Sequence, residues 1–186
     1  LLLIAFAGLS QPVNCDFGTD QGIDLPKNNS YQKMVGADEH GFYVLRVDEQ
    51  NRIWLEFWNG ENLIRETNNQ LILPSVSGIK AEFEEMYYLD GNLILFTTVT
   101  NESIKQKTLY LQHVNKSGKI IGESKPIGRL TNQNIQVDFN IQLTENKKNI
   151  FLYYHRNFQK YNEEPYFFKI YNPKLEEVLN KTVKLP

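Results

Sequence analysis

The fold is indicated by the stretch Asp90-Gly91-Asn92-Leu93-Ile94-Leu95-Phe96. Its pattern, a polar turn followed by a short apolar run, occurs three times in the chain. The other two runs are Phe42-Tyr43-Val44-Leu45 and Ile150-Phe151-Leu152-Tyr153, and each also follows polar turn residues. The runs lie about 55 residues apart, and a regular spacing of that size indicates an internal repeat.

A second apolar or aromatic run follows each of the first ones, at residues 53–57, 108–111 and 166–170. A turn rich in Asn, Gly or Pro comes next in all three cases, and these residues permit tight chain reversals. A mixed strand follows each turn, and a further strand-like stretch precedes each first run. Each unit is therefore predicted to be a four-stranded antiparallel meander. The units are expected at about 31–74, 80–128 and 135–186.

The first runs are apolar at nearly every position instead of alternating, and this is typical of strands covered on both faces of their sheet. Stacking small sheets around an axis covers them in this way. We therefore predict an all-β protein, with about three four-stranded antiparallel blades of an incomplete β-propeller in residues 31–186.

Propellers close with roughly four to eight blades. Three blades predict either further blades downstream or self-association, and they leave two outer faces uncovered. We expect Tyr43 or Leu45 on one uncovered face and Phe151 or Tyr153 on the other.

Residues 174–185 are the ambiguous segment. Leu175, Val178, Leu179 and Val183 have helical spacing, and the Glu and Lys residues between them favour a helix. The place of the segment in the repeat matches strands in the other two units, so a strand is predicted.

The chain begins with an apolar run of ten residues without a charge. A membrane-spanning helix needs roughly 20 apolar residues, so no membrane span is predicted, and the run has the length of a signal-peptide core. We expect residues 1–10 to be a signal peptide remnant and 11–30 an N-terminal linker. The alternative is a buried first strand. A signal peptide implies export to the periplasm, the cell surface or the medium.

Composition excludes several classes of protein. Hydrophobic residues make up 41% and charged residues 23% of the chain, which is typical of a globular protein. The net charge is −2 with both signs scattered, so no nucleic acid partner is predicted. Cys15 is the single cysteine, and this excludes an intramolecular disulfide.

The strand-turn-strand segments 108–114 with 117–122, and 167–175, resemble those of β-propeller-like cell-envelope proteins of Bacteroidota-type bacteria. The resemblance covers most of residues 36–185 and rests on structural motifs. It implies an envelope location and a propeller scaffold, and it supplies no active residue, because such proteins are largely of unassigned function. The departure from that family is the number of blades.

Motifs for catalysis are missing from the sequence. The histidines are far apart, and GxSxG, Walker A and GxGxxG motifs do not occur. No catalytic residue, metal site or cofactor is predicted. Asp90 and Asp138 lie near strand ends, where propeller glycosidases place carboxylates, but lone Asp residues at turns usually cap backbone amides.

Aromatic residues of the third unit supply the candidate binding site, for an unknown protein or saccharide partner. The candidates are Tyr153, Tyr154, Tyr161 and Tyr166. The expected function is an exported, non-catalytic propeller-type module for interaction or scaffolding in the cell envelope. The alternative is the N-terminal propeller part of a larger secreted hydrolase, a glycosidase or a peptidase.

Overall fold

The computed structural model describes residues 30–131, 137–155 and 164–185, and within these ranges every helix-or-strand element is a β-strand. The all-β class is therefore confirmed. None of the described residues belongs to a helix that could cross a membrane. The expected leader (1–10), nearly all of the expected linker (11–30) and Tyr161 lie outside the described residues.

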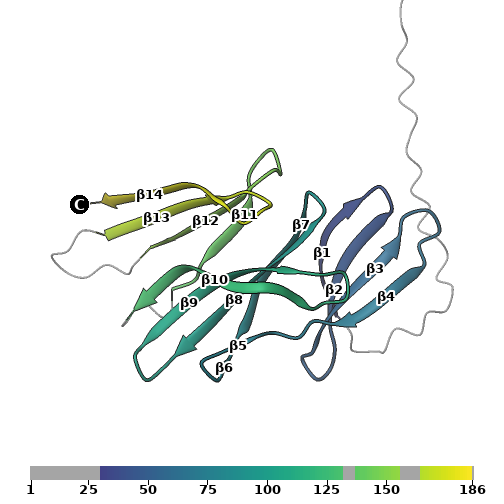
Figure 1. Ribbon diagram of the computed structural model, residues 1–186, viewed down its shortest axis with the longest axis horizontal. Helices are drawn as coiled ribbons and strands as arrows, with labels where there is room; N and C mark the ends of the chain where they lie inside the picture. The colour runs from purple at the N-terminus through teal and green to yellow at the C-terminus, as the bar shows by residue number, and fades with distance from the viewer. Residues whose placement is uncertain (1–29, 132–136, 156–163, 186) are drawn as a thin grey trace, which may run out of the picture.

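The described residues form three four-stranded antiparallel sheets, and in each the order of the strands in space follows the sequence. The N-terminal sheet contains β1 (Ser30–Asp38), β2 (Gly41–Val47), β3 (Ile53–Asn59) and β4 (Arg65–Gln70). The central sheet contains β7 (Glu82–Leu89), β8 (Asn92–Asn101), β9 (Gln106–Val114) and β10 (Ile120–Thr131). The C-terminal sheet contains β11 (Asn140–Leu143), β12 (Ile150–His155), β13 (Glu164–Tyr171) and β14 (Glu177–Leu185). A small hairpin of β5 (Ser75–Val76) and β6 (Ile79–Lys80) connects the first two sheets (Figure 1).

The recurrent apolar runs form the second strand of each sheet. The turn that precedes the central run is a two-residue hairpin, in which Asp90 and Gly91 have φ angles of 49° and 78°. Both values lie in the left-handed region, and Asp-Gly is a preferred sequence for such a turn. The turn sets the register, so that Leu89 pairs with Asn92 and Tyr88 with Leu93.

The ambiguous C-terminal segment is a strand, as predicted. Strand β14 pairs with β13 from Glu177 to Leu185, with one irregularity next to Tyr171. The β13 edge offers a full row of backbone hydrogen bonds, and these override the helical spacing of the apolar residues in β14.

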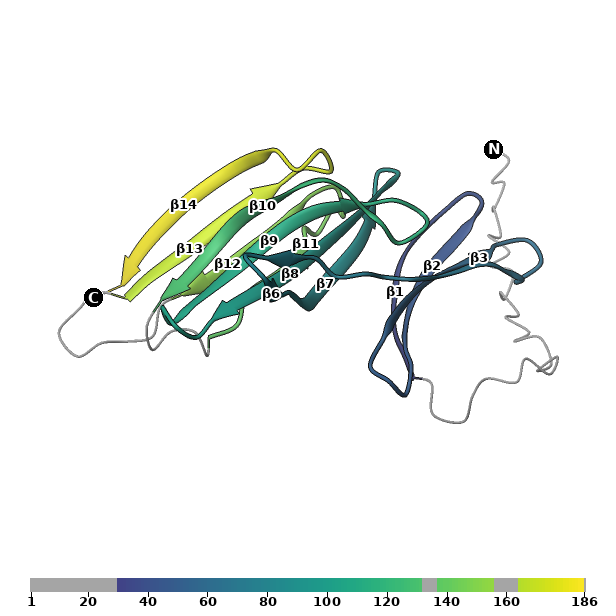
Figure 2. The ribbon, with the colours of Figure 1, turned by 60° about the horizontal axis from the view of Figure 1, so that its bottom comes forward.

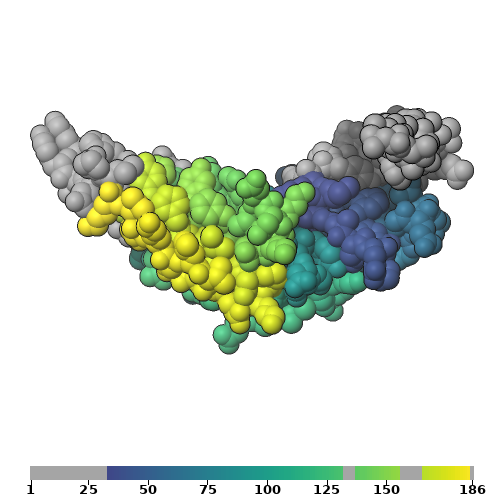
Figure 3. Space-filling model, turned by 90° about the horizontal axis from the view of Figure 1, so that it is seen from above, coloured from purple at the N-terminus to yellow at the C-terminus, as the bar shows by residue number. Residues whose placement is uncertain are grey.

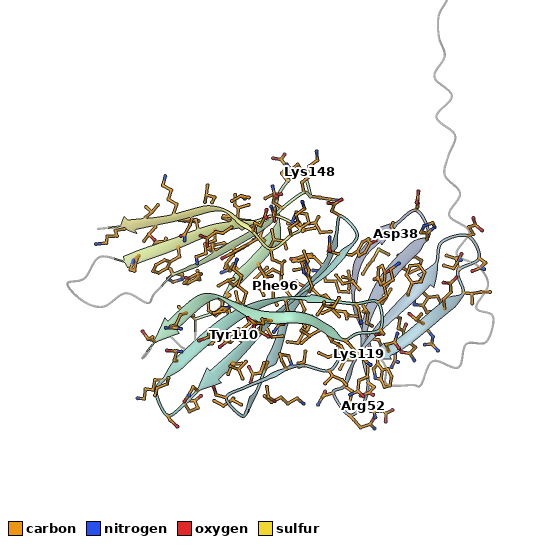
Figure 4. The ribbon with its side chains drawn as sticks, in the orientation of Figure 1. Asp38, Arg52, Phe96, Tyr110, Lys119 and Lys148 are labelled. Atoms are coloured by element: carbon orange, nitrogen blue, oxygen red, sulfur yellow. The ribbon has the colours of Figure 1, made fainter. Side chains whose placement is uncertain are left out.

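The central sheet packs against the C-terminal sheet on one face and against the N-terminal sheet on the other. Figure 2 shows the central sheet between the other two. Alternate residues of β8 point to opposite faces. Ile94 and Phe96 belong to the core shared with the C-terminal sheet, and Leu93 and Leu95 to the core shared with the N-terminal sheet. Figure 4 shows Phe96 between the central and C-terminal sheets. The strand is apolar at successive positions because both of its faces are covered, as predicted.

One expectation about the uncovered faces is wrong. Tyr43 and Leu45 of β2 are 0% and 1% exposed and belong to the core shared with the central sheet. Their neighbours Phe42 and Val44 point to the outer face instead. Side chains of a strand alternate, so an assignment that is wrong by one residue exchanges the two faces.

The first strands of the three sheets lie next to one another. Between β1 and β7, Lys33 forms an ion pair of 2.9 Å with Glu85, and the Tyr88 hydroxyl donates to Asp38 at 2.6 Å. Between β7 and β11, the Tyr87 hydroxyl donates to the backbone oxygen of Ile141 at 3.0 Å. The colours of Figure 3 follow the resulting order of sheets from purple to yellow.

Candidate interaction surfaces

Each sheet has two faces that can be defined by their neighbours. We call the face toward the next sheet along the chain the forward face, and the other one the rear face. The forward faces of the first two sheets carry the second and fourth residues of the apolar run, Tyr43 and Leu45 in β2 and Ile94 and Phe96 in β8. No described sheet covers the forward face of the C-terminal sheet or the rear face of the N-terminal sheet.

The uncovered forward face of the C-terminal sheet carries a group of neighbouring rings. We call it the aromatic surface, and its residues are Phe151, Tyr153, His155, Tyr166 and Phe168. Phe151 lies 5.9 Å from Tyr153 and 6.2 Å from Phe168, measured between ring centroids. The rings of these pairs are within 29° of parallel. All five side chains are partly buried, so the rings shield one another from water and still offer apolar area to a partner.

The aromatic surface extends across two strands through direct cross-strand pairs. Tyr153 is opposite Phe168, and His155 is opposite Tyr166 with a centroid distance of 5.2 Å. Aromatic cross-strand pairs of this kind stabilise a sheet. The pairing fixes the rings on regular strands, so the surface has a defined shape.

The four predicted tyrosines are divided by this arrangement. Tyr153 and Tyr166 lie on the aromatic surface, whereas Tyr161 is outside the described residues. Tyr154 is a correction: it is 5% exposed and packs in the core against Phe139 and Phe167, with centroid distances of 5.1 and 4.8 Å. Neighbours in a strand point to opposite faces, so adjacent Tyr153 and Tyr154 cannot share one surface. His155 was missed, although it is two residues after Tyr153, a spacing that places it on the same face.

The rear face of the N-terminal sheet is built around a buried carboxylate. Glu56 is 0% exposed and accepts hydrogen bonds from Arg46 Nε at 2.8 Å, Arg65 at 3.0 Å and Trp58 Nε1 at 3.1 Å. Two guanidinium groups and an indole N–H therefore replace the water that this carboxylate has lost. Arg46 also donates to Asn68 at 3.4 Å.

Large apolar rings surround Glu56. Phe42 is stacked on Trp58 at 6.4 Å and 5°, and the Arg46 guanidinium lies 5.5 Å from the centre of the Trp54 ring. We call this region the arginine–tryptophan surface, and it consists of Phe42, Arg46, Trp54, Glu56, Trp58 and Arg65. None of its residues was predicted from the sequence as part of a binding site. The signal was the spacing of Trp54, Glu56 and Trp58, which puts all three on one face of β3.

A polar residue lies at the same place on the rear face of every sheet, fully buried in the first two sheets and partly buried in the third. Glu56, Gln112 and Lys169 are directly opposite the third residues of the apolar runs. Gln112 donates to the Ser124 hydroxyl at 2.8 Å, and Lys169 Nζ donates to the backbone oxygen of Ile127 in the central sheet at 2.7 Å. Each of these groups has a partner, as a buried polar group requires.

Two carboxylates meet at one end of the central sheet. Glu84 and Asp138 are each 3.5 Å from Lys107 Nζ, and Glu84 also accepts a hydrogen bond from the Thr98 hydroxyl at 2.6 Å. Both carboxylates pair with Lys107, which would have to release at least one of them before the two could act on a glycosidic bond. Asp90 does not join them and is exposed in its hairpin turn. The described ranges contain no group of three or more His, Cys, Asp or Glu side chains arranged to hold a metal ion.

The tyrosines between the sheets have raised pKa values. Burial raises the pKa of Tyr88, and its hydrogen bond to the Asp38 carboxylate raises it further. The same hydrogen bond lowers the pKa of Asp38. Figure 4 labels Asp38 near the end of β1, next to the β1–β2 turn. Burial also raises the pKa of Tyr87, together with the negative charge of Glu85.

Comparison with known proteins assigns no family to these surfaces: no protein-family model matches the chain, and no curated protein matches it.

Proposed function

We propose that the chain is an exported, non-catalytic module of the propeller type that acts by binding or scaffolding in the cell envelope. The main support is the presence of large aromatic side chains on both outer faces of a stack of three sheets. Sheets that face water usually carry polar residues there, and contiguous apolar area on a surface marks an interaction site.

The propeller arrangement is supported by the stacking and by the contacts between first strands. In a propeller, four-stranded meanders surround an axis with their first strands innermost. Here β1 and β7 share an ion pair and a hydrogen bond, and β7 is bonded to β11. The fourth strands lie farthest from these contacts, and β4 and β14 are largely exposed, as outer strands are.

The partner of such a module is a protein or a saccharide, since aromatic rings fixed on strands suit both. A second candidate function is a propeller part of a larger secreted hydrolase. The observation in its favour is the meeting of Glu84 and Asp138 at one end of the sheet. A catalytic role for the pair would require Lys107 to move away from at least one carboxylate.

Two measurements test the proposal. Fractionation of cells that express the chain should find it outside the cytoplasm, and mass spectrometry should give an N-terminus near Gln11. The purified chain should not hydrolyse panels of glycosides and peptides. Hydrolysis that is lost in the double variant Glu84→Gln, Asp138→Asn, but kept in Asp90→Asn, would replace the proposal with the hydrolase. Retention in the cytoplasm would refute export.

A further inference from the structure

We propose that the aromatic surface binds the arginine–tryptophan surface of a second copy of this chain, so that two copies join head to tail. The inference rests on the propeller-type arrangement proposed above and names one partner for it. Both surfaces are the outer faces of a stack whose internal interfaces are already visible in the structure.

The proposed contact continues the pattern of the two interfaces inside the chain. In both, a forward face packs on a rear face. Tyr43 and Leu45 pack toward the rear of the central sheet, and Ile94 and Phe96 toward the rear of the C-terminal sheet. Phe151 and Tyr153 hold the same places in β12. The aromatic surface is therefore a forward face without a described rear face against it.

The rear face of the N-terminal sheet also has no described sheet against it. The rear faces of the central and C-terminal sheets are each covered by the preceding sheet. The arginine–tryptophan surface is the one rear face among the described sheets that no described sheet covers. A forward face and a rear face are different surfaces, so their union is heterologous, and it joins copies in a defined direction.

The charges that this contact would bury already have partners within the arginine–tryptophan surface. Glu56 already has three hydrogen-bond donors, so covering it leaves no unpaired carboxylate. Arg46 and Arg65 offer guanidinium planes that stack on aromatic rings, as they do with Trp54 and Trp58 in the chain itself. The aromatic surface supplies further rings and contains no acidic residue.

Two copies that join in this way can close into a ring of sheets. Two copies that join twice, each aromatic surface to the other copy's arginine–tryptophan surface, form a ring of six sheets. Six is within the usual range of about four to eight blades. A closed ring of two copies satisfies both outer faces and leaves no surface for further growth.

The sequence supplies a reporter for this contact. The chain has two tryptophans, Trp54 and Trp58, and both belong to the arginine–tryptophan surface. Tryptophan emission therefore reports on that surface alone. Phe168 lies on the opposite end of the stack, so a change there reaches the tryptophans only through a second copy.

The experiment is analytical ultracentrifugation of the full 186-residue chain over a range of concentrations, with tryptophan emission recorded on the same samples. We expect a species of twice 21.7 kDa and a shift of emission to shorter wavelength as it forms. Phe168→Glu and Phe42→Glu should each reduce association at least tenfold, and Phe168→Glu should abolish the emission shift. Ile104→Glu, in the exposed β8–β9 turn, is the matched control and should change neither. Circular dichroism checks that each variant is folded.

Several results would overturn the inference. A monomer at all concentrations, or open-ended growth beyond the dimer, contradicts it. A dimer that forms without an emission shift, and that Phe168→Glu dissociates but Phe42→Glu leaves intact, shows that the aromatic surfaces pair with each other. Association that survives both variants arises elsewhere in the chain. Export and the lack of hydrolysis are measured separately, so these results leave the proposed function standing.

Discussion

The central and N-terminal sheets have the same strand order but different surroundings. The central sheet has a sheet on each face, and in β8 seven consecutive residues, Leu93 to Val99, are buried. The N-terminal sheet is covered on one face by the central sheet, and in the equivalent strand β2 five residues are buried, with at most four of them consecutive. The difference shows that the covered faces of the central sheet are built mainly from aliphatic and aromatic side chains, with polar residues such as Gln112 held by a partner, whereas the outer face of the N-terminal sheet encloses a carboxylate among aromatic rings.

The largest expected effect of a substitution is in the doubly covered sheet. Phe96→Ala removes a ring that is fully buried between the central and C-terminal sheets. It should reduce the free energy of unfolding by about 3–5 kcal/mol, the usual cost of such a cavity. Chemical denaturation measures the difference, and Phe42→Ala on the outer face is the control with a smaller loss. Equal losses would show that Phe96 is not enclosed.

The buried carboxylate of the N-terminal sheet should rank second. Glu56→Ala leaves Arg46 without its charge partner in a largely buried position. Breaking a buried ion pair costs about 3–5 kcal/mol of the free energy of unfolding. Because Arg65 is partly exposed, we expect Glu56→Ala to reduce this free energy by about 2–3 kcal/mol. Glu66→Ala, at an exposed site of the same sheet, is the control and should cost less than about 0.5 kcal/mol. A neutral Glu56→Ala would mean that this network contributes nothing.

Alkaline pH tests the interfaces between sheets. The folded protein holds the pKa values of Tyr87, Tyr88 and Tyr171 above their ordinary value of 10.0. A raised pKa keeps the folded state protonated while the unfolded state loses protons, so stability is complete below pH 10 and decreases as pH rises above it.

Tyr87→Phe is the variant for this test. In this variant the free energy of unfolding should decrease less steeply as the pH rises above 10. At pH 7 the lost hydrogen bond to Ile141 should reduce the free energy of unfolding by about 1 kcal/mol. Denaturation midpoints between pH 8 and 11 give both values. If stability depends on alkaline pH in the variant as it does in the unsubstituted chain, Tyr87 ionises as it does in water.

The smallest effect is expected on the aromatic surface. Phe168→Ala should cost about 1 kcal/mol or less in the dilute monomer, because its ring is partly exposed and no described sheet covers it. Denaturation at low concentration measures this cost. A loss as large as that of Phe96→Ala would show that another part of the chain covers the ring.

The sequence predicts the strands of this protein well and the orientation of its faces less well. Asp90-Gly91 and the apolar run after it determine a hairpin locally, so the prediction needed no tertiary information. The placement of Tyr43 and Tyr154 depended on which side of the strand met a neighbour. That choice is made by packing between sheets, and in β2 both alternating sets include large apolar residues.

The arginine–tryptophan surface was harder to predict for another reason. Arg46 and Glu56 are ten residues apart, and Arg65 is nine residues beyond Glu56. The three meet only because β2, β3 and β4 are neighbours in one register. Pairing of whole strands was predictable from the turns, but the exact register that brings these charges together was not.

The stacking of the central sheet between the other two is tested by hydrogen exchange, followed by mass spectrometry on the dilute monomer. If one sheet is covered on both faces and two are covered on one, the amides of β8 and β9 should exchange most slowly, because they open only with global unfolding. Amides of β3 and β13 should exchange faster, and those of β4 and β14 fastest. Equal protection of the three sheets, or slower exchange in β3 or β13 than in β8, would contradict the stack described here.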